Sequence, residues 1–448
     1  MGRYADEYRS KLRTPDEAVK VVKSGDWVYY SHFAMMPRAL DEALAKRVGE
    51  VSNVNIRCVS PLRQPSVVAA DPEKKSFIYN SGHMSGIDRK LGDKGLCYYI
   101  PGNYGRVPIN IRNGYMYRPN VLFVVTAPMD KNGFFNFGAA CSYMRAASEM
   151  ADYVVVEVNE HAPVCLGGEQ ESIHISEVDF IVEHSAPLPT IPAEFEATEV
   201  DKAIAGHILE HIEDGACLQL GIGGMPNTVG KMIADSDLKD LGIHSEMMAD
   251  AFVDLFEKGK VTGARKNLDK YKMVYTFALG SQKLYEFIDS NPLCATYPVD
   301  LTNSPERIAM NDKVIAINNA VEIDLYGQVN SESSGFRNIS GTGGQLDFII
   351  GALNSRGGKG FICLSSTTTK NGQRVSRIVP WLSPGSIVSV PRSYSSYVVT
   401  EYGVANIMGK STYRKAEMLI EIAHPDFRDE LIKAAAEQRI WTRTNRIE

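Results

Sequence analysis

The chain of 448 residues is 44% hydrophobic and 23% charged, which is typical of a soluble globular protein. Its length exceeds the size at which one hydrophobic core keeps growing, so two or three domains are expected. The formal net charge is -6, and the 48 Lys and Arg residues form no long basic run, so we expect no nucleic-acid partner.

The N-terminal residues predict neither export nor a lipid anchor. Residues 1–6 open a charged segment without an apolar stretch, and Asp6 stands where a myristoylation motif has Ser or Thr. The most apolar run, residues 121–125, is too short to cross a bilayer and predicts a buried strand. Seven single cysteines without a C-x-x-C pair indicate reduced core thiols in a cytoplasmic protein: Cys58, Cys97, Cys141, Cys165, Cys217, Cys294 and Cys363.

Two parts of the chain repeat the same order of elements. Residues 18–37 and 203–226 both read as helix, glycine turn, apolar strand, loop and proline. The later apolar runs 152–157 and 396–401 also match each other and are typical of buried parallel strands. These matches favour a duplicated α/β fold, although α/β proteins also share such patterns by chance.

A helix-breaking segment separates the two halves. Residues 187–192 contain three prolines, as expected of an extended linker. We therefore predict an N-terminal α/β domain over residues 1–189 and a C-terminal α/β domain over residues 190–448. Ligands of such sheets bind outside the carboxyl ends of the strands, so the loops there are the candidates for chemistry.

The first candidate, the first glycine turn (residues 221–225), lies between an apolar strand and a helix whose first turn can contain Pro226. Such a turn presents backbone N–H groups to an anion. Pro226 occupies the third glycine position of a G-x-G-x-x-G motif, so the dinucleotide signal is weak, and a purely structural tight turn remains an alternative.

The second candidate is Glu246, which follows a short apolar strand and precedes the amphipathic helix predicted over residues 249–256. It therefore lies at the carboxyl end of a strand, where chemistry is expected. From position alone, the simpler explanation is an acidic residue favoured near a helix N-terminus.

The third candidate, the second glycine turn (residues 341–344), also precedes an apolar run. Gly343 and Gly344 let backbone amides approach a reacting carbonyl and could donate to an oxyanion. The alternative is a flexible turn in which Gln345 and Asp347 act as caps.

The sequence gives little support for a metal site, a serine hydrolase or a P-loop nucleotide hydrolase. His207 and His211 have helical spacing but lack the H-E-x-x-H motif and a third ligand, so we expect no metal site. No G-x-S-x-G elbow and no P-loop motif is present. Lys370, Arg374 and Arg377 could meet phosphates, although solvated surface charges are the commoner explanation.

Together these stretches resemble the class I CoA-transferases, in particular the single-chain butyryl-CoA:acetate and 4-hydroxybutyrate enzymes, over nearly the whole chain. The motifs that carry the resemblance are Ser-Gly-Asp (24–26), Val-Glu-Val-Asn (156–159), His-Ile-Ser-Glu-Val-Asp (174–179), Gly-Ile-Gly (221–223), Gly-Ile-His-Ser-Glu-Met (242–247), the run 340–348, Thr-Glu-Tyr-Gly (400–403) and Ala-His-Pro-Asp-Phe (423–427).

The resemblance implies two open α/β domains of similar topology with the active site between them. It implies that Glu246 is the nucleophile and that Gly343 and Gly344 line the reacting thioester. The residues implied to contact CoA are Gly221, Ile222, Gly223, Gly224, Met225, Gly344 and Lys370. The family's basic segment before residues 371–372 is reduced here to Lys370, which weakens that part of the assignment.

The function implied is transfer of CoA between butyryl-CoA or 4-hydroxybutyryl-CoA and acetate through a glutamyl-CoA thioester. The CoA thioester is a substrate, and neither a metal nor a tightly bound cofactor is expected. We expect a homo-oligomer, a dimer or a tetramer, with no membrane partner.

Three alternatives remain open at this stage. They are an acyl-CoA hydrolase on the same scaffold, a CoA- or nucleotide-binding regulator, and a nicotinamide dehydrogenase. The presence of Glu246 counts against the regulator, and Pro226 counts against the dehydrogenase. The choice of acid depends on pocket shape, for which the loops 35–37, 82–86 and 103–105 are the candidates.

Overall fold

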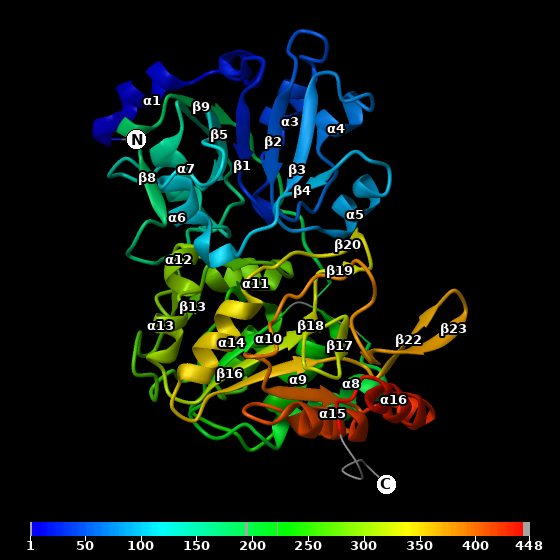
Figure 1. Ribbon diagram of the computed structural model, residues 1–448. Helices are drawn as coiled ribbons and strands as arrows, with labels where there is room; N and C mark the ends of the chain where they lie inside the picture. The colour runs from blue at the N-terminus through cyan, green and yellow to red at the C-terminus, as the bar shows by residue number, and fades with distance from the viewer. Residues whose placement is uncertain (1, 193–195, 222, 442–448) are drawn as a thin grey trace. The chain divides into compact units, whose positions relative to one another are not determined.

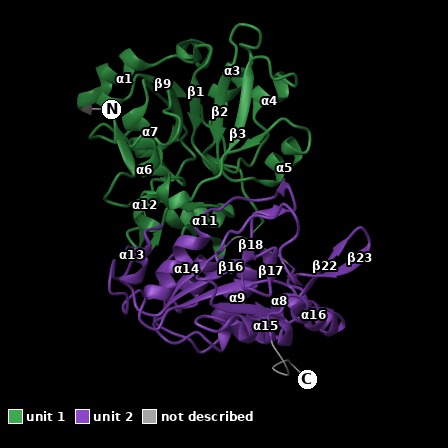
Figure 2. Cartoon of the chain, viewed as in Figure 1, with its two compact units in different colours: residues 1–192, 246–250, 274–302 green, residues 193–245, 251–273, 303–448 purple. Residues whose placement is uncertain are grey.

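The computed structural model describes residues 2–192, 196–221 and 223–441. The chain folds into two compact units, coloured in Figure 2. Unit 1 comprises Met1–Pro192, Glu246–Asp250 and Val274–Thr302, and unit 2 comprises Ala193–Ser245, Ala251–Met273 and Asn303–Glu448. The domain boundary at residue 190 stays a prediction. The unit that contains the N-terminal residues also contains Glu246.

Unit 1 is built on a parallel sheet with the strand order β4-β3-β2-β1-β5-β7-β9 (Figure 1). The strands are β1 (Trp27–Tyr30), β2 (Val54–Cys58), β3 (Phe77–Ser81), β4 (Tyr98–Tyr99), β5 (Val121–Thr126), β7 (Tyr153–Val158) and β9 (Phe180–Glu183). Every residue of β5 is buried, which confirms the buried strand predicted over residues 121–125. Burial along both faces is typical of a parallel strand that is covered on each side.

Short helices connect these strands, and Figure 1 shows α3 and α4 beside β2 and β3. The helices of unit 1 are α1 (Ala5–Lys11), α2 (Pro15–Ala18), α3 (Ala39–Ala45), α4 (Ser66–Ala70), α5 (Gly86–Gly92), α6 (Val107–Arg112), α7 (Met144–Met150), α11 (Gln282–Ile288) and α12 (Val299–Thr302). Local sequence sets their starts. The Ser85 side chain accepts from the backbone N–H groups of Ile87 and Asp88 in a capping box that begins α5.

Unit 1 also contains short strands outside its main sheet. Strands β6 (Phe134–Asn136) and β8 (Ser172–His174) pair antiparallel, whereas β12 (Met247–Met248) and β14 (Phe277–Ala278) pair parallel. Strand β15 spans Cys294–Thr296, and β13 spans Met273–Tyr275, of which Met273 belongs to unit 2.

Unit 2 contains a second, mostly parallel sheet, in which six strands follow the order β11-β10-β16-β21-β25-β26. These strands are β10 (Cys217–Leu220), β11 (Gly242–His244), β16 (Val314–Asn319), β21 (Lys359–Cys363), β25 (Tyr397–Thr400) and β26 (Gly403–Asn406), and only β26 runs antiparallel to its neighbour. The helices are α8 (Glu199–Leu209), α9 (Gly224–Asp235), α10 (Asp250–Glu257), α13 (Pro305–Ala309), α14 (Gln345–Asn354), α15 (Thr412–Glu421) and α16 (Pro425–Glu437).

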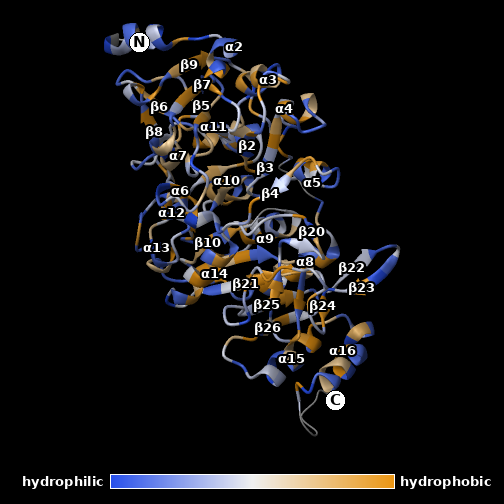
Figure 3. Ribbon diagram, turned by 45° about the horizontal axis from the view of Figure 1, so that its top comes forward, coloured by the Kyte–Doolittle hydropathy of each residue, from blue (hydrophilic) through white to orange (hydrophobic). Residues whose placement is uncertain are grey.

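Smaller β elements complete unit 2. They are the sheet of β17 (Glu322–Asp324), β18 (Val329–Asn330) and β24 (Ile378–Val379), the pair β19 (Ser333–Ser334) and β20 (Arg337–Asn338), and the hairpin β22 (Thr367–Lys370) and β23 (Gln373–Ser376). The hairpin is largely hydrophilic, whereas the central strands are largely hydrophobic (Figure 3).

The two sheets confirm the predicted pair of α/β domains of similar topology. Strands β1 and β10, which the repeat matched to each other, are equivalent. Strand β1 lies between β2, the next main-sheet strand in the chain, and the later strand β5. In the same way, β10 lies between β11, the next strand, and the later strand β16. The second match does not extend to position, because β7 is the second strand from β1, whereas β25 is the third from β10.

The predicted core thiols are confirmed, since all seven cysteines are free and buried. None of the helices within the described residues has both the length and the apolar character needed to cross a bilayer.

Replacing Phe361 by Ala should lower the free energy of unfolding by about 3–5 kcal/mol, because its ring is fully buried in β21 and packs 5.1 Å from the Tyr397 ring. The matched control is Phe336→Ala in the same unit. That ring is 89% exposed, so its loss should change stability by less than about 0.5 kcal/mol. Denaturant titrations of both variants measure this contrast, and equal losses would contradict it.

Candidate active site

The first glycine turn connects β10 to α9 in unit 2. Gly223 is the N-cap residue of α9, with φ 124° and ψ -179°, a backbone conformation that essentially only glycine adopts. Helix α9 begins at Gly224, so Pro226 lies in its first turn as predicted. Ile222, predicted to contact CoA, lies outside the described residues. The turn therefore directs the N-terminus of a 12-residue helix toward any ligand at the end of β10.

The second glycine turn leads into α14 in the same unit. Gly343 has a φ of 53°, and Gly344 is the N-cap residue of α14. The Gln345 side chain donates to the carbonyl oxygen of Asn319 at 3.2 Å, while a Cβ atom added to Gly223 would lie 3.5 Å from Asn319 Nδ2. Both glycine turns thus adjoin the last residue of β16. Sequence reasoning did not identify Asn319, which no motif distinguishes.

Lys370 ends β22 at the turn of the exposed hairpin. Asn371 and Gly372, with φ values of 50° and 79°, form the two-residue turn that favours an Asn-Gly sequence. Lys370 and Arg377 line a cavity of about 530 Å³ together with Arg337 and several hydroxyl groups. The cavity therefore combines three cations with hydrogen-bond donors, a set that suits an anionic group such as a phosphate.

The protein itself holds two charged groups of this cavity, Glu322 and Arg377. The carboxylate of Glu322 accepts from Ser383, Ser386 and Asn330, so its acceptor sites are occupied. The Arg377 side chain donates to Ser365 Oγ at 3.1 Å, and burial lowers the pKa of its guanidinium. Three cationic side chains thus line the cavity against one acidic side chain.

Glu246 lies in unit 1, between β11 and β12 in the chain. Its carbonyl oxygen accepts from the backbone N–H groups of Thr276 at 3.0 Å and Phe277 at 3.3 Å. Its neighbours Ser245 and Met247 are buried, whereas Glu246 is partly exposed. Glu246 is therefore at the end of a strand, as the sequence predicted.

The alternative explanation of Glu246 is an acid at a helix N-terminus, and in α10 that position is occupied by Asp250. Helix α10 begins at Asp250, and the Asp250 carboxylate accepts from the backbone N–H of Ser281 at 3.0 Å and from its hydroxyl. Asp250 is the acid in the first turn of α10. Glu246 itself lies outside this helix, before its first residue Asp250.

Aromatic side chains pack beside the Glu246 backbone within unit 1. The Phe277 ring stacks on the Phe33 ring at a centroid distance of 3.9 Å and meets the Tyr104 ring edge-on at 6.3 Å. The Tyr104 hydroxyl lies 2.5 Å from Ser142 Oγ. Burial raises the pKa of Tyr104 well above its usual value, and the charge of Glu246 raises it further. Tyr104 therefore stays protonated at neutral pH.

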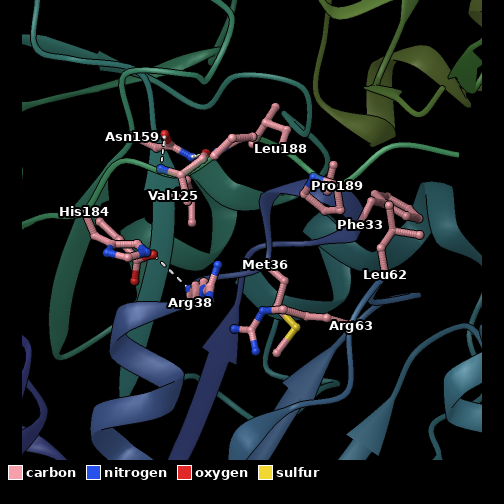
Figure 4. Close-up of a pocket in the computed structure, with 14 residues that line it drawn as sticks. Phe33, Met36, Arg38, Leu62, Arg63, Val125, Asn159, His184, Leu188 and Pro189 are labelled. Atoms are coloured by element: carbon pink, nitrogen blue, oxygen red, sulfur yellow. Dashed lines mark hydrogen bonds between the residues drawn. The ribbon is translucent and has the colours of Figure 1, made fainter. Parts of the chain in front are cut away.

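A small cavity of about 150 Å³ lies at the carboxyl ends of the unit 1 strands (Figure 4). Its apolar lining includes Phe33, Leu62, Val125 and Leu188, and its polar lining includes Arg38, Arg63, Asn159 and His184. Of the three loops predicted to form the acid pocket, only the loop 35–37 contributes a residue to this cavity, Met36.

Glu157 fixes one side of this cavity and belongs to one of the motifs that carried the resemblance. Its buried carboxylate accepts backbone N–H groups of Arg38 at 2.8 Å and Leu40 at 2.9 Å, at the start of α3. Burial raises the pKa of Glu157 despite these bonds. The Arg63 side chain is held by Asp41 at 3.0 Å. The hydrogen bonds of Glu157 and the ion pair of Arg63 thus hold the loops around the cavity in place.

Among the residues that the structure describes, no three His, Cys, Asp or Glu side chains are grouped so that they could hold a metal ion.

Comparison with known proteins identifies the family. Residues 2–192 match the acetyl-CoA hydrolase/transferase N-terminal domain, and residues 280–435 match the acetyl-CoA hydrolase/transferase C-terminal domain. The chain is 53% identical to the butyryl-CoA:acetate CoA-transferase of Anaerostipes caccae, over 99% of this chain and 100% of that protein. It is 50% identical to the probable butyrate:acetyl-CoA coenzyme A-transferase of Syntrophomonas wolfei, over 99% of this chain and 98% of that protein.

A solved structure agrees with these sequence matches. The crystal structure of RipA from Yersinia pestis superposes with a TM-score of 0.88 at 36% identity, over 97% of this chain and 99% of that chain. The match therefore covers nearly the full length of both chains. The chain therefore belongs to the acetyl-CoA hydrolase/transferase family and is one of its CoA-transferases.

Proposed function

We propose that this protein transfers CoA between butyryl-CoA and acetate, with Glu246 as the covalent nucleophile. The observation that carries the proposal is the 53% identity, over 99% of the chain, to a butyryl-CoA:acetate CoA-transferase. The partly exposed position of Glu246 at a strand end, where Asp250 already serves as the helix-terminal acid, supports its role.

In the first half-reaction, a Glu246 carboxylate oxygen attacks the carbonyl carbon of butyryl-CoA and the C–S bond breaks. This gives a butyryl-glutamyl anhydride and CoA thiolate. The thiolate then attacks the glutamyl carbonyl carbon, which releases butyrate and leaves a glutamyl-CoA thioester. One thioester has replaced another, so the step needs neither a phosphate donor nor a redox partner.

In the second half-reaction, acetate attacks the glutamyl-CoA thioester and runs the same steps in reverse. An acetyl-glutamyl anhydride and CoA thiolate form, and attack of the thiolate on the acetyl carbonyl releases acetyl-CoA and the free Glu246 carboxylate. Each addition passes through a tetrahedral oxyanion. We assign the backbone N–H groups of Gly343 and Gly344 as donors to it, an effect typically of about 3 kcal/mol per donor.

The remaining site residues bind the ends of the substrate. We assign the first glycine turn, including Gly221, Gly224 and Met225, to CoA, because the N-terminus of α9 favours negative charge. The cationic cavity that contains Lys370 is the site we assign to a phosphate group of CoA. Interactions with this distant end supply binding energy that positions the thioester.

The cavity beside Glu157 suits the short acid. A cavity of about 150 Å³ holds a molecule of roughly six non-hydrogen atoms, which is the number in butyrate. Its mixed lining provides contacts for an alkyl chain and for a carboxylate. Acids with longer chains should therefore be poor substrates.

The first experiment tests the nucleophile. Incubation with butyryl-CoA alone should leave CoA on the protein as a thioester within residues 242–248, detected by peptide mass mapping. Glu246→Gln should abolish this adduct and lower turnover by at least about a thousandfold, because an amide is a poor nucleophile. Glu286→Gln, an exposed acid of the same unit, is the control and should behave like the wild type.

The same assay separates transferase from hydrolase. With acetate present, the transferase forms acetyl-CoA, whereas a hydrolase releases free CoA thiol at the same rate with or without acetate. Free thiol as the main product would reject the proposed transfer, and an adduct on another residue would reject Glu246.

The second experiment tests the first glycine turn. Gly223→Ala should raise KM for butyryl-CoA about tenfold, because a Cβ at φ 124° strains the turn by about 1–3 kcal/mol. Gly259→Ala is the matched control, since Gly259 also has a positive φ, of 71°, with open space around its Cβ position. An equal change of KM in both variants would argue against CoA binding by the turn.

The third experiment tests the cationic cavity. Lys370→Ala should raise KM for butyryl-CoA about five- to tenfold and leave kcat unchanged, because one charge-assisted contact at an exposed site is lost. The butyryl thioester of pantetheine, which lacks the nucleotide phosphates, should show no such increase. An equal increase of KM for both thioesters would disprove the phosphate contact.

A further inference from the structure

A buried carboxylate lies beside the second glycine turn within unit 2. Glu332 is located between β18 and β19 and keeps only 4% of its surface exposed. Its Oε2 accepts from the Thr342 hydroxyl at 3.2 Å, and Thr342 lies between Gly341 and Gly343 of the turn. The side chain of Glu332 is thus bonded directly to the glycine turn.

The backbone of Glu332 also holds the segment that leads into the turn. Its carbonyl oxygen accepts from the N–H groups of Ile339 at 2.8 Å and Ser340 at 3.2 Å. These bonds continue the antiparallel pair of β19 and β20 beyond its last paired residues. Glu332 therefore holds the chain at three of the four residues that precede Gly343.

Glu332 is itself fixed by a buried asparagine. The side-chain oxygen of Asn330 accepts from the N–H groups of Glu332 and Ser333, each at 3.1 Å. The Asn330 amide nitrogen donates to the Glu322 carboxylate at 3.2 Å and to the Ser333 carbonyl oxygen at 2.8 Å. Asn330 is fully buried, so both of its polar atoms bond within the protein. A shift of the Glu332 backbone would therefore break these bonds.

The other side of the turn has a separate anchor. The Gln345 side chain donates to the Asn319 carbonyl oxygen at 3.2 Å, and the Phe348 N–H donates to the Gly344 carbonyl oxygen at 3.0 Å. Between the two anchors, the N–H groups of Gly343 and Gly344 donate to no backbone carbonyl oxygen among the described residues. These are the N–H groups assigned above as donors to the oxyanion.

The chemistry of the Glu332 contact explains the use of a carboxylate. Moving a carboxylate out of water is costly unless hydrogen bonds replace the lost hydration. A hydroxyl that donates to a charged acceptor makes a stronger bond than two neutral groups do. The bond to Glu332 therefore restrains Thr342 more than a neutral bond would, and Gly343 directly follows Thr342.

We propose that Glu332 is a positioning residue for the second glycine turn: through Thr342 it holds the N–H groups of Gly343 and Gly344 in the orientation in which they donate to the oxyanion. The inference rests on the proposed function, in which these two groups stabilise that oxyanion. Preorganised donors act on the transition state, so a turn that is no longer held should lose rate and keep its affinity for the substrate.

Thr342→Val removes the hydroxyl donor and keeps the shape of the side chain. The maximal rate of glutamyl-CoA adduct formation from butyryl-CoA, followed by rapid quench, should fall about 10- to 100-fold. The butyryl-CoA concentration that gives half of this rate should change less than about twofold, because the lost interaction acts only in the transition state. Thr342→Ser restores the hydroxyl and should return the rate to within about threefold of the wild type.

Replacement of the carboxylate gives an independent test. Glu332→Ala removes the acceptor and should slow adduct formation as much as Thr342→Val does, whereas Glu332→Gln keeps an acceptor oxygen and should slow it only several-fold. The double variant Glu332→Ala/Thr342→Val should be no slower than the slower single variant, because both substitutions break the same bond. If Glu332→Ala does not fold, the comparison of Thr342→Val with Thr342→Ser decides by itself.

Ser396→Ala is the matched control. Ser396 is a buried residue of the same unit whose hydroxyl donates to the Gly360 carbonyl oxygen at 2.8 Å, outside the glycine turns, so its loss should lower Tm and leave the maximal rate unchanged. Wild-type rates in Thr342→Val and Glu332→Ala, or a higher half-saturating concentration at an unchanged rate, would overturn the inference. Neither result would affect the assignment of Glu246, whereas an adduct that persists in Glu246→Gln would overturn the proposed function itself.

Discussion

Burial of the parallel strands along both faces is the constraint on which the rest of the structure depends. In β5 and β10 every residue is buried, so neither face of these strands can present a polar group to a substrate. Polar chemistry is therefore confined to the strand ends. The glycine turns adjoin the ends of β10 and β16, and the small cavity forms at the ends of β1, β2, β5, β7 and β9.

The location of the polar groups at strand ends also explains the unusual backbone conformations at the site. Loops that leave buried strand ends must turn sharply, and the turns are held by hydrogen bonds rather than by solvent. Gly223 adopts a conformation available only to glycine, whereas Phe33 and Ser142 adopt positive φ values of 53° and 47° despite their side chains. Such strain persists where the surrounding contacts over-determine it, as at Ser142, whose backbone N–H and carbonyl oxygen are both hydrogen-bonded.

The chemistry of the proposed reaction fits a protein of this kind. Exchange of one thioester for another requires a carboxylate, donors for an oxyanion and exclusion of water, and it requires no cofactor chemistry. Helix N-termini and backbone amides at strand ends supply donors that need no reorganisation. The side chains then have the narrower tasks of attack, orientation and recognition of the acid.

Much of the fold could be predicted from local patterns. The apolar run at residues 121–125 forms β5, and the amphipathic pattern over residues 249–256 forms α10, which spans Asp250–Glu257. The repeat correctly paired β1 with β10, because a glycine turn before an apolar strand is a short-range signal. Its second match paired strands at different positions, since similar buried strands share composition whatever their place in a sheet.

The sequence by itself determined the elements, the positions of the glycine turns and the candidate nucleophile, since each depends on a few adjacent residues. Only the tertiary structure decided that residues 246–250 and 274–302 pack with the N-terminal unit, that Asn319 adjoins both glycine turns, and that Tyr104 meets Ser142. The physical reason is that these contacts join residues far apart in the chain. Their hydrogen bonds and packing leave no periodic pattern in the sequence.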